Sequence, residues 1–87
     1  MRHARPKDLD RLEPLLEKLR RLRGMKEKSR GLFYRGSRAF LHFHEHGGGF
    51  FADVRLDLAD DFERLPATTR VERNALVVTV RKALSKK

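Results

Sequence analysis

The sequence predicts a small α+β domain of order α-β-β-β-(short β)-α, with two helices packed on one face of an antiparallel meander sheet. Three observations predict it: leucines at helical spacing between residues 9 and 22, two glycine-rich turns within residues 30–58, and a helix-capping signal at residues 69–72 followed by a second apolar helical face. The 87 residues are expected to form one domain, with residues 1–7 and 85–87 as mobile tails.

The first helix is predicted from one stripe of leucines at helical spacing: Leu9, Leu12, Leu15, Leu16, Leu19 and Leu22. Arginines near the end of this stretch suit the helix dipole, and Gly24 is a suitable stop. Pro14 would destabilise the interior of a helix by about 3 kcal/mol but is tolerated in the first turn. We therefore expect the helix either to begin near residues 10–13 or to bend at Pro14.

The three central strands are predicted from two tight turns, Gly36-Ser37 and Gly48-Gly49, because glycine reaches positive φ at little cost. The second turn then places Phe43 opposite Val54. Because side chains alternate along a strand, both turns give one apolar face that should meet the helices. That face comprises Leu32, Tyr34, Leu41, Phe43, Val54 and Leu56.

The opposite face of the predicted sheet mixes aromatic rings with histidines and charges: Phe33, Phe40, His42, His44, His46, Phe51, Asp53, Arg55 and Asp57. One layer of helices covers one face only, so we expect this face to be open or to meet another subunit. The leading interpretation is a small interaction module that forms a homodimer, or docks a partner, through this face. The candidate interface residues are Phe33, Phe40, His42, His44 and Phe51.

The remaining segments are predicted from local signals. Residues 25–29 should form a charged connector, and residues 62–68 a short extended edge segment, a position that suits Pro66. Thr69 and Glu72 form a capping-box signature for a last helix. Residues 76–80 also have strand propensity, but the cap and the basic end of the chain favour a helix.

Composition narrows the classes of function. The chain has no cysteine, which excludes disulfides and thiolate chemistry. No apolar run resembles a signal peptide or a membrane span, so we expect a cytoplasmic protein without membrane contact. No nucleophile, base or carboxylate pair forms a catalytic pattern. We therefore expect no enzyme activity, no cofactor and no small-molecule substrate.

Two alternative functions remain open. The strand face that carries His42, His44 and His46, with a carboxylate on the next strand, suits a zinc-type metal site. The candidate ligands are His42, His44 and Asp53. The net charge of +9, concentrated outside the sheet, suits nucleic-acid binding, although an arginine-rich composition alone would also produce it. The nucleic-acid candidates are Arg20, Arg21, Arg23, Lys26, Lys28, Arg30, Arg35 and Arg38.

Part of the sequence resembles a family of small bacterial proteins with no assigned activity. The resemblance lies in residues 33–35 (FYR), 39–45 (AFLHFHE), 51–55 (FADVR), 62–64 (FER) and 68–69 (TT). It implies a fold but no mechanism. More loosely, residues 33–40 look like the central hairpin of MmcQ/YjbR-type proteins, which implies no residue roles.

Overall fold

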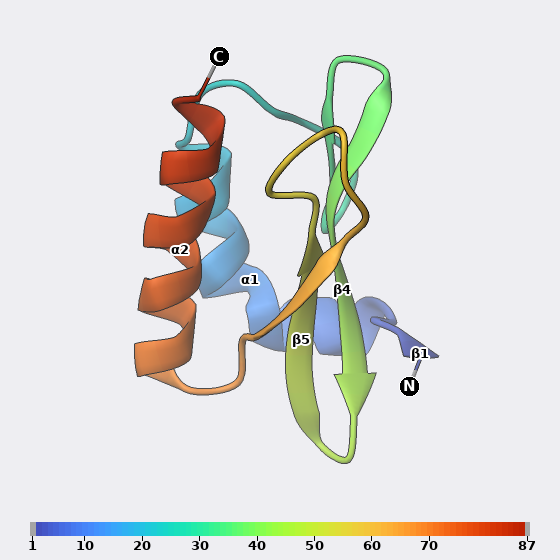
Figure 1. Cartoon of the computed structure of the whole chain (residues 1–87). Helices are drawn as coiled ribbons and strands as arrows, with labels where there is room; N and C mark the ends of the chain where they lie inside the picture. Colours follow the sequence, from blue (N-terminus) through green and yellow to red (C-terminus); the bar gives the residue numbers. More distant parts are fainter. Residues whose placement is uncertain (1, 87) are drawn as a thin grey trace.

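The computed structural model describes residues 2–86 and contains two helices and a six-stranded antiparallel sheet (Figure 1). The helices are α1 (Pro6–Arg20) and α2 (Arg70–Leu84); the strands are β1 (Arg2–His3), β2 (Lys26–Ser29), β3 (Leu32–Arg35), β4 (Arg38–His46), β5 (Gly49–Val54) and β6 (Glu63–Pro66). The strand order is β2-β3-β4-β5-β6, and β1 pairs with β4 beside this path. The predicted α+β meander is confirmed.

Both helices lie on the same side of the sheet, and the hydrophobic core fills the space between the two layers (Figure 1). The leucine stripe of α1 meets the apolar face of α2 and the alternating side chains of β4 and β5. Fully or almost fully buried members of this core include Leu12, Leu15, Leu16, Leu19, Leu41, Phe43, Phe50, Val54, Leu76 and Val80.

Helix α1 begins earlier than residues 10–13 and contains Pro14 in its interior. Its first turn is closed by Asp8, whose Oδ2 accepts a hydrogen bond from the backbone N–H of Arg5 at 2.9 Å. The helix bends along its length (Figure 1), as expected where proline supplies no N–H to the preceding turn.

The predicted N-terminal tail contains regular secondary structure. Residues Arg2–His3 form β1 and α1 begins at Pro6, whereas the mobility of this segment stays a prediction. At the other end Ser85 caps α2, and the N–H of Lys86 bonds the carbonyl of Ala83. Residues 1 and 87 lie outside the described part of the chain.

The hairpin between β4 and β5 turns at Gly47 and Gly48, which have φ values of 59° and 82°. The predicted register was wrong by two residues, because the turn uses the first two of three consecutive glycines. Phe43 therefore pairs with Ala52 instead of Val54. A shift of two residues returns each side chain to the same face, so the predicted faces of β4 and β5 are retained.

The hairpin between β3 and β4 turns at Gly36-Ser37 as predicted, but a β-bulge follows it. Tyr34 pairs with Ala39 and Phe33 with Leu41, so Phe40 is the extra residue. The bulge reverses the expected face of β3. Phe33 and Phe40 are 1% and 0% exposed and belong to the core; their predicted position on the uncovered face is wrong.

The remaining elements extend the predicted sheet and confirm the last helix. Strand β6 pairs with β5 as the expected edge segment, whereas the predicted connector at residues 25–29 contains the edge strand β2. Residues 76–80 are helical. The capping box of α2 is formed: Thr69 Oγ1 accepts from the N–H of Glu72 at 3.1 Å, and Glu72 Oε1 accepts from that of Thr69 at 3.0 Å.

Candidate metal centre

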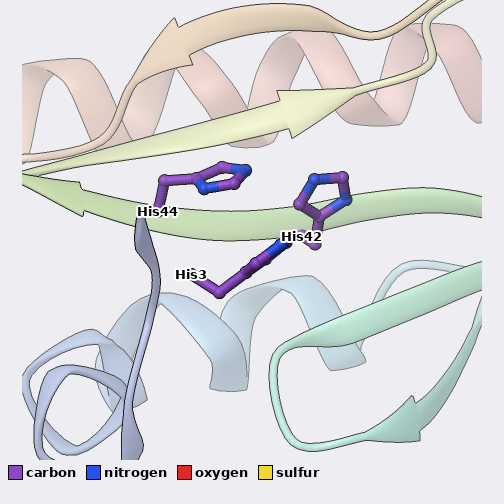
Figure 2. Close-up of side chains that lie close together, drawn as sticks. All are labelled: His3, His42 and His44. Atoms are coloured by element: carbon purple, nitrogen blue, oxygen red, sulfur yellow. The ribbon is translucent and has the colours of Figure 1, made fainter. Parts of the chain in front are cut away.

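Three histidines converge on the sheet face that points away from the helices (Figure 2). His42 and His44 alternate along β4 with the core residues Leu41 and Phe43 and so face the other way. His3 comes from β1, whose backbone pairs with β4 directly opposite His44. The N–H of the next residue, Ala4, bonds the carbonyl of Phe43 at 3.0 Å and holds β1 in this register.

The spacing of the three imidazoles suits one metal ion. Ring centroids lie 4.6 Å apart for His3 and His44, 5.0 Å for His42 and His44, and 5.5 Å for His3 and His42. One ring nitrogen from each histidine lies within 4.8 Å of the others. Donor atoms around a tetrahedral zinc ion lie roughly 3.3 Å apart, because Zn–N bonds measure about 2.0–2.1 Å. Small side-chain rotations would therefore bring the three nitrogens to bonding distance.

Asp53 adds a carboxylate to the cluster from β5, where it pairs with His42. Its Oδ2 lies 2.8 Å from Nε2 of His44 and 3.4 Å from Nε2 of His42. From β6, Arg64 donates to both carboxylate oxygens, from Nε to Oδ1 at 2.8 Å and from Nη2 to Oδ2 at 3.0 Å. Burial raises the pKa of Asp53, but the Arg64 hydrogen bonds and the neighbouring positive charges outweigh it, so the pKa lies below its usual range.

The cluster is buried yet incompletely hydrogen-bonded. His44 and Asp53 are 8% and 7% exposed. Although His44 Nε2 and Asp53 Oδ2 are close, they lack the alignment of a hydrogen bond, and neither ring nitrogen of His44 has a hydrogen-bond partner among residues 2–86. Burial, with the charges of His44 and His3, lowers the pKa of His42 against the opposing effect of Asp53. An unprotonated imidazole is the form that binds metal.

A surface cavity of about 210 Å³ lies beside His3 and His42. It exists because two strands share one edge of β4: β3 pairs with its first half and β1 with its second. Between them His42 has no strand partner on this side. The cavity gives the cluster an opening to solvent, which an ion needs in order to enter.

Metal binding by the predicted ligand set stays a prediction. The structure brings together His42, His44 and Asp53, as expected. It also adds His3, which sequence reasoning assigned to a tail, because a two-residue strand has no hydrophobic pattern to reveal it. His46, on the same strand, is exposed at the turn and lies outside the cluster.

Fewer of the candidate interface residues lie on the uncovered sheet face than the sequence predicts. Phe33 and Phe40 are in the core and unavailable to a partner. Of the other candidates, His42 and His44 belong to the histidine cluster and Phe51 is half-buried. Phe62 covers part of this face: its ring packs edge-on against His42 at 4.8 Å, and the Arg55 guanidinium lies over it at 4.3 Å.

The candidate nucleic-acid residues differ in how many contacts their charged groups already make with other parts of the chain. Arg20 is ion-paired with Glu13, Glu17 and Glu27, and Arg30 with Asp10 and Glu13. Arg35 lies over Phe40 and donates to the carbonyl of Ala83 in α2. The remaining candidates are exposed: Arg21, Arg23, Lys26, Lys28 and Arg38. Nucleic-acid binding through all eight stays a prediction.

Comparisons with known proteins add no assignment. No family model, curated protein or solved structure matches this sequence. The resemblance to the small bacterial family therefore stays a prediction. Within residues 2–86, neither helix is long and apolar enough to cross a membrane.

Proposed function

We propose that this protein binds one zinc-type transition metal ion through His3, His42 and His44, with Asp53 as the carboxylate of the site. The observation that supports this most directly is the state of His44. Its imidazole is buried beside two other imidazoles. Its Nε2 lies 2.8 Å from Asp53 Oδ2 without hydrogen-bond geometry, and its Nδ1 has no hydrogen-bond partner among the described residues. An unsatisfied buried polar group costs roughly 1–3 kcal/mol, and a metal–nitrogen bond would remove that penalty.

The donor set favours a borderline metal. Imidazole suits zinc, copper and nickel, whereas magnesium and calcium prefer oxygen ligands. Three histidines with one carboxylate oxygen match the ligand types that zinc accepts. Copper and nickel are expected to bind in vitro as well, because affinity for such sites generally follows the Irving–Williams order.

The ion would join two parts of the chain that are distant in sequence. His3 belongs to β1 near the start of the chain, and His42 and His44 belong to β4 at the centre of the sheet. Binding would cross-link β1 to the sheet and stabilise the folded state by mass action. We therefore infer a metal-binding module in which the ion has a structural effect.

The test uses untagged, metal-free protein titrated with Zn²⁺ by calorimetry and with Co²⁺ by visible absorption. One ion should bind each chain. His3→Ala and His44→Ala should each weaken binding about tenfold or more, whereas the matched control His46→Ala, altered on the same strand outside the cluster, should change affinity less than about twofold. Failure to saturate at one ion per chain, or equal losses in His44→Ala and His46→Ala, would contradict the proposal.

Asp53 is tested separately, because it contacts both a histidine and Arg64. In Asp53→Asn the side chain keeps its size but loses its charge, and we expect metal affinity to fall about 10–100-fold, as for partners that orient or supplement metal ligands. The Co²⁺ spectrum should also change. An unchanged affinity and spectrum would remove Asp53 from the site while leaving the three histidines in place.

A further inference from the structure

A second polar site lies on the opposite side of the molecule, between the two helices. A cavity of about 190 Å³ opens where the middle of α1 faces the first turns of α2. Its polar lining includes three cationic side chains and one amide: Lys18, Arg70, Arg73 and Asn74. A cavity of this size admits several water molecules, and so it can also admit a phosphate group.

The cations around this cavity have no carboxylate counter-ion within residues 2–86. This distinguishes them from Arg20 and Arg30, which are paired with acids on the outer surface of α1. Glu17, which precedes Lys18, pairs with Arg20. Glu72, which precedes Arg73, accepts hydrogen bonds from the N–H groups of Thr68 and Thr69.

The backbone holds Arg73 at the cavity. Its Nε donates to the carbonyl of Ala67 at 3.0 Å and its Nη1 to that of Arg11 at 3.4 Å. Nη2 makes no hydrogen bond to the described residues, so its N–H groups remain for a ligand. The side chain of Arg11 also lies close, since both guanidiniums lie over the ring of Phe50, at 5.1 Å for Arg11 and 6.0 Å for Arg73.

Like charges are therefore concentrated at this end of α2. Burial and the charge of Arg11 lower the pKa of Arg73, which shows that the environment opposes its positive charge. A bound anion would relieve that opposition. Lys18 Nζ donates to Asn74 Oδ1 at 3.3 Å, which leaves the Asn74 amide nitrogen as a further donor. The capping box of α2 engages the N–H groups of Thr69 and Glu72, and the donors assigned to the site are side chains.

We propose that this cavity binds a phosphoryl group, held by Lys18, Arg70 and Arg73 with Asn74 as a neutral donor. Arginine and lysine donors to phosphate form charge-assisted hydrogen bonds, which are roughly twice as strong as neutral ones. The ligand is a phosphate ion or the phosphate of a larger molecule. The site is independent of the histidine cluster and does not rest on metal binding.

The test is titration with inorganic phosphate at low ionic strength, followed by calorimetry and by ³¹P NMR, with a chelator present so that metal at the histidine site plays no part. Saturable binding at one phosphate per chain is expected. Lys18→Gln and Arg70→Gln, which alter side chains at the surface, should each weaken binding about fivefold or more. The matched control Arg38→Gln, at the distant β3–β4 turn, should change it less than about twofold, and His44→Ala should leave it unchanged.

Two further arms identify the source of the phosphate. A sugar phosphate and a short single-stranded oligonucleotide are each added in competition with inorganic phosphate. Displacement by the oligonucleotide, weakened by Lys18→Gln, would assign the site to a nucleic-acid backbone; displacement by the sugar phosphate alone would assign it to small phosphate esters. Absence of saturable phosphate binding, or equal weakening by Arg38→Gln and Arg70→Gln, would overturn the proposal.

Discussion

The two faces of the sheet differ in whether their buried side chains find matching partners, which are apolar contacts on one face and hydrogen bonds on the other. The helix-covered face contacts apolar side chains almost everywhere, with Leu41, Phe43 and Val54 fully or nearly fully buried. The other face buries Asp53 beside His44, whose ring nitrogens have no hydrogen-bond partner among the described residues. The packing on the helix-covered face requires only apolar side chains of complementary shape. The arrangement on the other face leaves a buried polar group without a hydrogen-bond partner, which costs free energy and is the basis of the metal-binding proposal.

The largest expected effect tests the face assigned to Phe33. Phe33→Ala should lower the free energy of unfolding by about 3–5 kcal/mol, because the ring is fully buried in the core. Phe51→Ala, its counterpart on the histidine face, should cost clearly less, because that ring is half-buried. Chemical denaturation measures both. Equal losses would contradict the β-bulge that turns Phe33 toward the helices.

The next largest effect is stabilisation by zinc, which should depend on the histidine face alone. Zinc at one hundred times its dissociation constant should raise the free energy of unfolding by about 2.7 kcal/mol. At the same zinc concentration, a tenfold or greater loss of affinity in His44→Ala should reduce this increment to about 1.4 kcal/mol or less. His46→Ala should retain the full increment, as measured by thermal or chemical unfolding with and without chelator. An undiminished increment in His44→Ala would place the metal elsewhere.

A smaller effect tests whether the histidine face destabilises the protein in the absence of a bound ligand. In metal-free protein, His44→Leu should raise the free energy of unfolding by about 1–2 kcal/mol, because it replaces an unsatisfied buried imidazole by an apolar group of similar size. Leu41→His, the reverse exchange on the helix-covered side, should destabilise the protein. A destabilising His44→Leu would show that the imidazole contributes to the fold without metal.

The smallest effect concerns the outer surface of α1, where carboxylates form ion pairs with arginines. Hydrogen bonds from Arg20 and then Arg30 lower the pKa of Glu13 to about 2. Because this folded-state pKa lies below the ordinary value of 4.5, the stabilisation is complete above pH 4.5 and disappears as the pH falls toward 2. Glu13→Gln should therefore flatten the acid limb of a stability–pH curve between pH 5 and pH 2. An identical limb in both proteins would contradict this.

Local signals were sufficient for the helices and for one turn. The leucine stripe and the Thr69–Glu72 capping box act over a few residues, so they identify α1 and α2 without tertiary information. Gly36-Ser37 likewise determines its own turn. The choice among Gly47, Gly48 and Gly49 was not local, because any two of three glycines can form the loop, and strand pairing decides between them.

By itself, the sequence determined the fold class and the sheet face of the central histidines, because helical spacing and strand alternation are properties of short segments. Only the tertiary structure decided which residues meet. The bulge that buries Phe33 and Phe40 depends on packing against the helices, and β1 brings His3 to His44 through pairing across some forty residues of chain. The cavity beside Arg73 likewise forms only when α1 and α2 pack together. Contacts of this kind depend on the whole core and are not encoded in any short window.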